Sequence, residues 1–153
     1  MAQDRLETEK ELSALIARFP VCITYVALPT EVAFRNIIPE LPARTYEIAP
    51  SVALDPIQEA LKARAVADDD ETVVLIPGRA FDALGTRHGR GDGWYDRFLA
   101  HTPIEWTRIG FCFDDQFSEE ALPLQPWDQV MDFVAVASRS SNRLILHTTH
   151  ARS

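Results

Sequence analysis

Five of the chain's six glycines lie between residues 78 and 93, directly after a short apolar segment. Ordered glycine costs conformational entropy, so this clustering indicates a loop whose backbone must turn with positive φ or approach a ligand closely. The apolar segment 72–76 predicts a buried strand, and residues 94–101 predict a helix. A strand, a glycine-rich loop and the start of a helix, in this order, point unpaired backbone N–H groups at an anion.

The rest of the chain alternates between segments typical of helices and of strands. Apolar residues at helical spacing predict a helix within residues 3–19. Residues typical of a helix start predict two more helices, one from Thr30 and one from Asp55-Pro56. Apolar runs predict strands at 21–28, 108–113 and 131–137, and residues 143–148 are expected to complete a small edge hairpin. Residues 39–56 hold four prolines and predict an irregular loop. We therefore expect one α/β domain over residues 1–153, with a mostly parallel, Rossmann-like sheet and helices on both faces.

The charge and the apolar runs of the chain argue against nucleic acid and membranes as partners. With 23 acidic and 15 basic residues the net charge is −8, so the overall field repels nucleic acid. No apolar run is long enough to cross a bilayer and the first residues carry no signal-peptide pattern, so we expect a cytoplasmic protein without a membrane partner. Cys22 and Cys112 lie within apolar runs and are expected to be buried thiols.

The glycine-rich loop also carries positive charge that can hold a small anion against the overall field. Its arginines, and those beside it, are Arg79, Arg87, Arg90 and Arg97. The loop lacks the Gly-Lys-Ser/Thr ending of a P-loop, and its last three glycines follow the spacing GxGxG rather than GxGxxG. The two standard phosphate-binding motifs therefore do not describe it.

The loop does resemble the signature of another family. Residues 77–99 read PGRAFDALGTRHGRGDGWYDRFL and are similar to the pattern PGLAFD..G.RLGYGGGYYDRFL of the 5-formyltetrahydrofolate cyclo-ligases. Residues 25–31, 109–116 and 123–132 also resemble segments of that family. The resemblance implies ATP-dependent closure of 5-formyltetrahydrofolate to 5,10-methenyltetrahydrofolate, with release of ADP and phosphate.

The resemblance also implies the site. It assigns ATP binding to Gly85, Arg87, His88, Gly89, Arg90, Gly91, Asp92, Gly93, Trp94 and Tyr95, with Arg87 and Arg90 as the catalytic cations. It assigns Mg²⁺ binding to Asp96 and Asp128, two hard oxygen donors from separate segments. It assigns contacts with the folate substrate to Val26, Glu31, Arg90 and Trp94.

The resemblance is incomplete, and it leaves alternatives open. Members of the family carry an N-terminal helix with a Lys...Arg motif and a central hairpin, and we find no match for either here. Asp92 brings a carboxylate to a phosphate-binding loop, where it repels the anion unless a cation compensates. The chain is therefore expected to be a shortened or divergent cyclo-ligase. The alternatives are an inactive paralogue that binds nucleotide or folate, or an interaction protein that keeps only the fold and forms a homodimer through an exposed apolar patch.

Three of the assigned carboxylates also have a purely local explanation. Glu31 and Asp96 are expected in first turns of helices, where the helix dipole stabilises an acidic side chain. Asp128 is also explained as a helix or turn cap.

Overall fold

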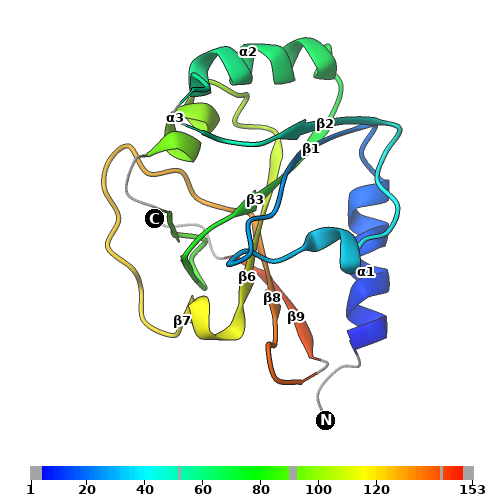
Figure 1. Cartoon of the computed structure of the whole chain (residues 1–153), viewed down its shortest axis with the longest axis vertical. Helices are drawn as coiled ribbons and strands as arrows, with labels where there is room; N and C mark the ends of the chain where they lie inside the picture. Colours follow the sequence, from blue (N-terminus) through cyan, green and yellow to red (C-terminus); the bar gives the residue numbers. More distant parts are fainter. Residues whose placement is uncertain (1–4, 52, 90–92, 142, 150–153) are drawn as a thin grey trace.

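A six-stranded sheet forms the centre of the computed structural model, which describes residues 5–51, 53–89, 93–141 and 143–149. The strand order is β2-β1-β3-β6-β8-β9 (Figure 1). The strands are β1 (Val21–Tyr25), β2 (Arg44–Ile48), β3 (Thr72–Pro77), β6 (Thr107–Phe113), β8 (Phe133–Ala137) and β9 (Leu144–Thr148). All neighbours pair in parallel except β8 and β9, which pair antiparallel. The predicted parallel α/β sheet with an edge hairpin is confirmed.

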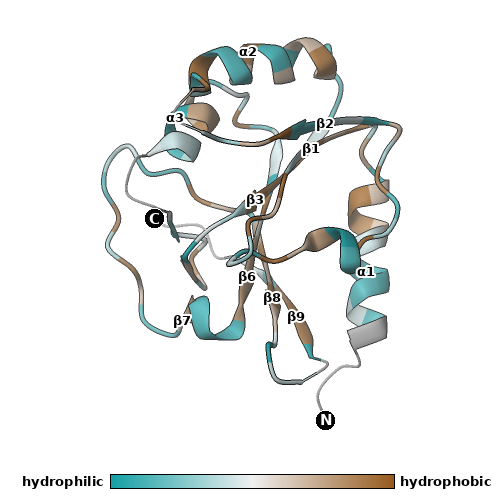
Figure 2. Cartoon of the chain, in the orientation of Figure 1, coloured by the Kyte–Doolittle hydropathy of each residue, from teal (hydrophilic) through white to brown (hydrophobic). Residues whose placement is uncertain are grey.

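Helices cover both faces of this sheet, as Figure 1 shows. Helix α1 (Arg5–Ala17) lies on one face, while α2 (Pro56–Ala67) and α3 (Trp94–Ala100) lie on the other. Side chains alternate along β3: Val73 and Leu75 belong to the core cluster beneath α1, whereas Val74 and Ile76 belong to the cluster beneath α2 and α3. Figure 2 shows the corresponding hydrophobic colour along the inner strands, with hydrophilic positions interspersed along α1 and α2.

Helix α2 begins where its sequence predicts. The Asp55 side chain accepts a hydrogen bond from the Ile57 amide at 3.1 Å, and Pro56 occupies the first helical position. The helix ends at Asp68, whose φ of 47° terminates it in the left-handed region.

Two local predictions are wrong. No α-helix follows Thr30, because the Glu31 amide and side chain close a turn with Leu28, and only a 3₁₀ turn at Phe34–Asn36 comes after it. The expected loop 39–56 contains β2, an edge strand whose mostly exposed or half-exposed residues do not form an apolar run.

The glycine-rich loop is itself folded into part of a second, small sheet. Its strands are β4 (Ala80–Asp82), β5 (Arg87–His88) and β7 (Phe117–Ser118), in the order β5-β4-β7. β4 pairs antiparallel with β5 and parallel with β7. A segment far along the chain therefore supports the loop. In the part of the chain described here, no helix combines the length and apolar character needed to span a membrane.

Candidate functional site

The site lies where the strand order reverses, at the carboxyl ends of β1 and β3. The chain passes from β1 outward to β2 on one side and from β3 to β6 and β8 on the other. Crevices at such reversal points are the usual ligand sites of parallel α/β sheets. Val26 and Glu31 follow β1, and the glycine-rich loop follows β3, so two of the predicted groups share one edge.

Asp82 fixes the shape of the loop. Its buried carboxylate accepts hydrogen bonds from the amides of Leu84 at 3.0 Å and Thr86 at 2.9 Å through Oδ1. Its Oδ2 accepts from the amide of Leu122 at 2.8 Å, which ties the loop to the segment after β7. The loop is therefore held by a charged acceptor of several backbone groups, although the sequence alone did not single out Asp82.

Gly85 serves close packing of the loop. Its φ is +85°, and a Cβ at this position would lie 2.3 Å from the carbonyl oxygen of Met131. The Met131 amide donates to the Gly85 carbonyl at 2.8 Å. Glycine is therefore required here by a backbone contact, in addition to any approach of a ligand.

Arg87 is the buried cation of the loop. Only 8% of the residue is exposed, and its Nε donates to the Pro77 carbonyl at 2.6 Å. The guanidinium carbon lies 4.7 Å from the centre of the Tyr95 ring. A Cβ at Gly89 would lie 2.8 Å from a terminal nitrogen of this guanidinium, so Gly89 makes room for it. The Pro77 carbonyl, the open position at Gly89 and the Tyr95 ring thus orient one cation.

Of the remaining predicted loop residues, some contact the rest of the fold and others lie outside the described residues. The Nε2 of His88 lies 2.8 Å from the carbonyl oxygen of Pro123. Gly93, with φ of 68°, precedes α3 without a side-chain cap. Trp94 is only 6% exposed, its indole N–H donates to Leu54, and its ring stacks on Phe98 at 5.6 Å. The predicted residues Arg90, Gly91 and Asp92 lie outside the described residues.

The two predicted magnesium ligands are close enough to affect each other. Burial raises the pKa of Asp96, and Asp128 raises it further, whereas the Gln129 amide and Arg87 oppose the shift. Asp96 Oδ1 accepts from the Gln129 amide at 3.1 Å. Asp128 Oδ2 accepts from the Gln125 amide at 2.8 Å, so the expected turn-cap contact is present.

This pair fits a hard divalent cation. Burial and the neighbouring Asp128 disfavour the charge of the Asp96 carboxylate by raising its pKa, and a cation bound beside it would relieve this effect. Within the described ranges, no cluster of three or more histidine, cysteine, aspartate or glutamate side chains could hold a metal. Two protein ligands completed by water and phosphate oxygens are the usual arrangement for Mg²⁺.

The predicted substrate contacts sit on the neighbouring strand end. Val26 is 45% exposed, and its amide donates to Ile48 at 3.0 Å. Glu31 Oε1 accepts from the Leu28 amide at 2.9 Å, so one oxygen has a local role in a turn. Tyr25 is the last residue of β1, and its hydroxyl donates to the Val32 carbonyl at 2.7 Å. Burial raises the pKa of Tyr25, and Glu31 and then Tyr95 add to the shift.

Arg108 and Gln129 were not predicted. Arg108 is 3% exposed, and its Nη1 donates to Gln129 Oε1 at 2.9 Å. The only sequence indication is an arginine at the start of the apolar run Ile-Gly-Phe-Cys-Phe, where a buried cation needs partners.

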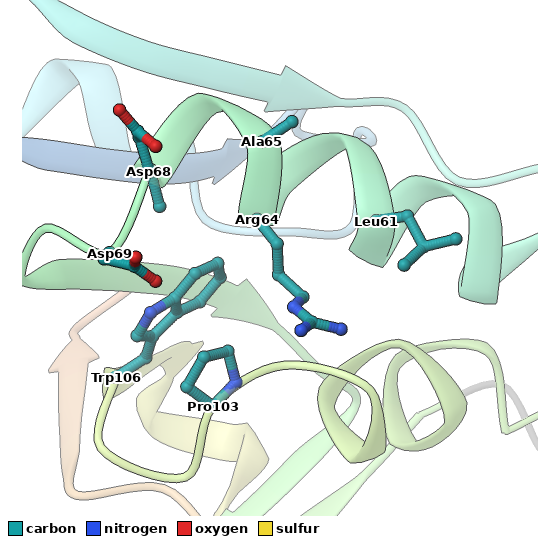
Figure 3. Close-up of a pocket in the computed structure, with 8 residues that line it drawn as sticks. Leu61, Arg64, Ala65, Asp68, Asp69, Pro103 and Trp106 are labelled. Atoms are coloured by element: carbon teal, nitrogen blue, oxygen red, sulfur yellow. The ribbon is translucent and has the colours of Figure 1, made fainter.

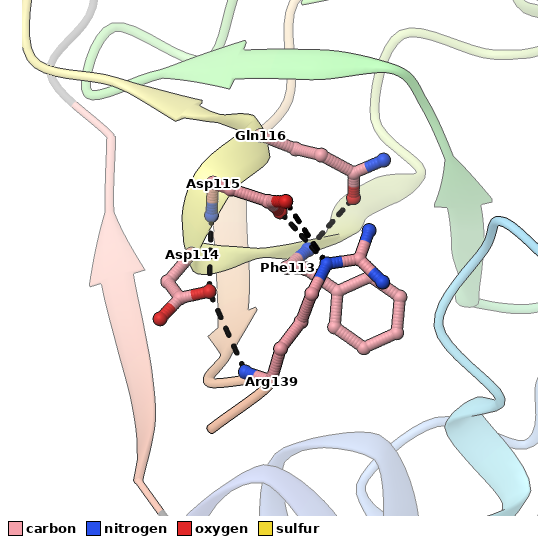
Figure 4. A network of polar contacts seen from close by, with 5 residues as sticks. All are labelled: Phe113, Asp114, Asp115, Gln116 and Arg139. Carbon is pink, nitrogen blue, oxygen red and sulfur yellow. Dashed lines mark hydrogen bonds and ion pairs between the residues drawn. The ribbon is translucent and has the colours of Figure 1, made fainter. Parts of the chain in front are cut away.

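Two other features of the fold involve neither Asp96 nor Asp128. A cavity of about 380 Å³ opens between α2 and the turn before β6, and Arg64, Asp68, Asp69 and Trp106 are among its lining residues (Figure 3). At the ends of β6 and β8, Arg139 donates to Asp115 at 3.0 Å and stacks on Phe113 (Figure 4).

Comparisons with known proteins identify the family of this chain. The pattern that defines the 5-formyltetrahydrofolate cyclo-ligase family matches residues 13–137. A 5-formyltetrahydrofolate cyclo-ligase of Mycolicibacterium smegmatis is 37% identical over 79 residues, which cover 52% of this chain and 39% of the relative. One of Mycoplasma genitalium is 35% identical over 66 residues, or 43% of this chain and 39% of the relative. The matched stretch thus spans well under half of these relatives.

Solved structures show the same fold. The 5,10-methenyltetrahydrofolate synthetase of Aquifex aeolicus superposes with a TM-score of 0.59 at 20% identity, covering 97% of this chain and 83% of that one. The synthetase of Mycoplasma pneumoniae gives a TM-score of 0.56 at 19% identity, over 86% of this chain and 83% of that one. Because the family pattern covers most of its length, the chain belongs to the 5-formyltetrahydrofolate cyclo-ligase family.

Proposed function

We propose that this chain closes 5-formyltetrahydrofolate to 5,10-methenyltetrahydrofolate with the use of ATP, releasing ADP and phosphate. The observation that carries the proposal is the convergence of one buried, oriented arginine and two mutually interacting carboxylates at the glycine-rich loop. An oriented cation and a metal pair are what a phosphoryl transfer needs, since its catalysis is mainly positioning and charge stabilisation.

The reaction proceeds in two steps. The formyl oxygen of the substrate attacks the terminal phosphorus of ATP, a new O–P bond forms, and the bond to ADP breaks. The neighbouring amine then attacks the activated carbon, phosphate leaves with its electron pair, and the amine loses its proton. Arg87 would stabilise negative charge on the transferring group in the first step. Asp96 and Asp128 would hold Mg²⁺, which supplies charge neutralisation on the phosphates when bound.

The folate would lie toward the end of β1, beside the exposed Val26 and the partly exposed Glu31. Arg90 would extend the cationic wall between nucleotide and folate, as the family resemblance implies. Two free, buried cysteines suit the reducing cytoplasm, where we place the reaction. A homodimer stays part of the proposal, without a specified interface.

One observation favours the inactive paralogue as a second candidate. Trp94, which the family resemblance assigns to ATP binding and to the folate contact, packs on Phe98 and donates its indole N–H to the Leu54 carbonyl. If no other side chain takes the place of Trp94 in contacting the folate ring, the chain would bind a nucleotide without converting folate.

Calorimetric titration of ATP and of 5-formyltetrahydrofolate, each alone, tests the assigned role of Arg87. We expect Arg87→Ala to weaken ATP binding more than tenfold and folate binding much less, because a charged hydrogen bond contributes about 1.5–3 kcal/mol. Arg64→Ala, which removes an exposed arginine from α2, is the matched control and should leave both affinities unchanged. An equal loss of both affinities in a folded Arg87→Ala protein would contradict the assignment.

A further inference from the structure

Residues 125–132 form a segment that crosses from β7 past α3 to β8, and we call it the crossing segment (Figure 1). It carries Asp128, so its position sets the geometry of the carboxylate pair. Its backbone amides at three positions donate to other parts of the fold: Met131 to Gly85 at 2.8 Å, Gln129 to Asp96 at 3.1 Å, and Asp132 to Arg108 at 2.9 Å. It contains no regular secondary structure, so these contacts take the place of a helix or strand.

Arg108 contacts this segment through both its backbone and its side chain. Its backbone amide donates to Asp132 Oδ2 at 2.8 Å, and its Nη1 donates to Gln129 Oε1 at 2.9 Å. Its Nη2 lies 3.3 Å from the carbonyl oxygen of Leu99, the residue near the end of α3. One side chain therefore joins β6, α3 and the crossing segment.

The burial of this guanidinium is costly. Arg108 is 3% exposed, and its Nε–H has no hydrogen-bond partner among the described residues. A buried cation with one unsatisfied donor costs folding stability unless hydrogen bonds and nearby opposite charges compensate, so such a residue calls for an explanation. Asp132 and Asp96 supply nearby negative charge that partly compensates.

We propose that Arg108 is a positioning residue for the divalent-metal site: by holding the Gln129 side chain, it fixes the crossing segment so that Asp128 faces Asp96. This inference rests on the proposed function, because it assigns a role toward the metal of that same site. Arg108 does not touch the metal or the substrate. Outer contacts of this kind typically change metal affinity 10- to 100-fold.

The test is a titration of ¹⁵N-labelled protein with Mg²⁺ alone, followed through the amide NMR signals of Asp96, Asp128 and Gln129. We expect Arg108→Met to weaken Mg²⁺ binding about tenfold. Gln129→Met, at a half-buried position, removes the same contact without removing a buried charge and should have a similar effect. In the double variant the losses should not add, because both changes break one interaction.

Arg18→Met removes an exposed arginine after α1 and should leave Mg²⁺ affinity unchanged. Thermal unfolding of every variant separates metal affinity from stability, and Gln129→Met keeps the test valid if Arg108→Met does not fold. The inference is overturned if folded variants bind Mg²⁺ as the wild type does while only their melting temperature falls, or if the two losses add.

The titration involves neither ATP nor folate, so it is independent of turnover. Wild-type protein without Mg²⁺-dependent shifts at these amides would also overturn the inference. Absence of methenyltetrahydrofolate formation in a protein that binds Mg²⁺ as expected would instead count against the proposed function alone.

Discussion

At the residue scale, the negative charge of Asp96 lowers the stability of the fold although the residue is proposed to have a function. It is half-buried beside Asp128, and its pKa is raised mainly by burial, so the fold disfavours its negative charge. A site arranged for a cation has this property before the cation binds. Arg87 also opposes stability, because its charged guanidinium is buried against Tyr95 and the Pro77 carbonyl and loses contact with water.

We expect Asp96→Asn to raise the free energy of unfolding by about 1 kcal/mol in buffer without divalent cations, because it removes the disfavoured charge. The corresponding rise in melting temperature is about 2–4 °C for a chain of this size. Added Mg²⁺ should stabilise the wild type but not the variant, as thermal denaturation followed by circular dichroism would measure. A variant that is less stable than the wild type and still stabilised by Mg²⁺ would show that Asp96 is a structural residue.

At the scale of elements, the glycine-rich loop and the crossing segment form one unit. Gly85 connects them through its backbone contact with Met131, and Arg108 connects the crossing segment to β6. The sequence predicted the strand and helix on either side of the loop, because these have clear apolar patterns. It did not predict β4 and β5, since strands of two or three residues owe their pairing partly to β7, far along the chain.

Comparison of Gly85→Ala with Gly93→Ala tests how much the contact between the loop and the crossing segment contributes to stability. Both glycines have positive φ, of 85° and 68°, but a Cβ at Gly93 meets no atom of the described residues within 4 Å. We expect Gly93→Ala to cost about 1 kcal/mol of backbone strain. Gly85→Ala should cost about 2–4 kcal/mol, because the Met131 carbonyl must also move. Urea denaturation measures both, and equal costs would mean that the contact between the two segments contributes little.

At the scale of the whole molecule, the sequence predicted the architecture well because the inner strands are continuous apolar runs with helices between them. β2 was missed because an edge strand with exposed Arg44 and half-exposed residues lacks that pattern. The approach of Asp96 to Asp128 could be expected only from the family resemblance, since no spacing rule joins α3 to the crossing segment. The contact between Arg108 and Gln129 could not be predicted either, because no sequence spacing relates β6 to the crossing segment.

The two buried thiols give the whole fold a pH dependence. Burial raises the pKa of both Cys22 and Cys112 from 9.0 to about 12. Above pH 9 the unfolded chain therefore binds fewer protons than the folded one, and stability falls as the pH rises from about 9 toward 12. Below pH 9 these thiols should have no effect.

Urea denaturation across this range measures the effect, with a Cys22→Ala, Cys112→Ala double variant as the control. The stability of the variant should fall less steeply with pH than that of the wild type. Identical slopes would mean that the thiols ionise as readily in the folded protein as in the unfolded chain.

The buried Arg87 and the carboxylates Asp96 and Asp128 are proposed to serve an ATP-dependent ring closure. The most direct measurement is the absorbance of methenyltetrahydrofolate formed by the purified protein with 5-formyltetrahydrofolate, ATP and Mg²⁺. We predict product that appears only when all three are present and that is lost in Arg87→Ala. A folded protein that forms no product with all three present, or that forms it equally without ATP, would contradict the account.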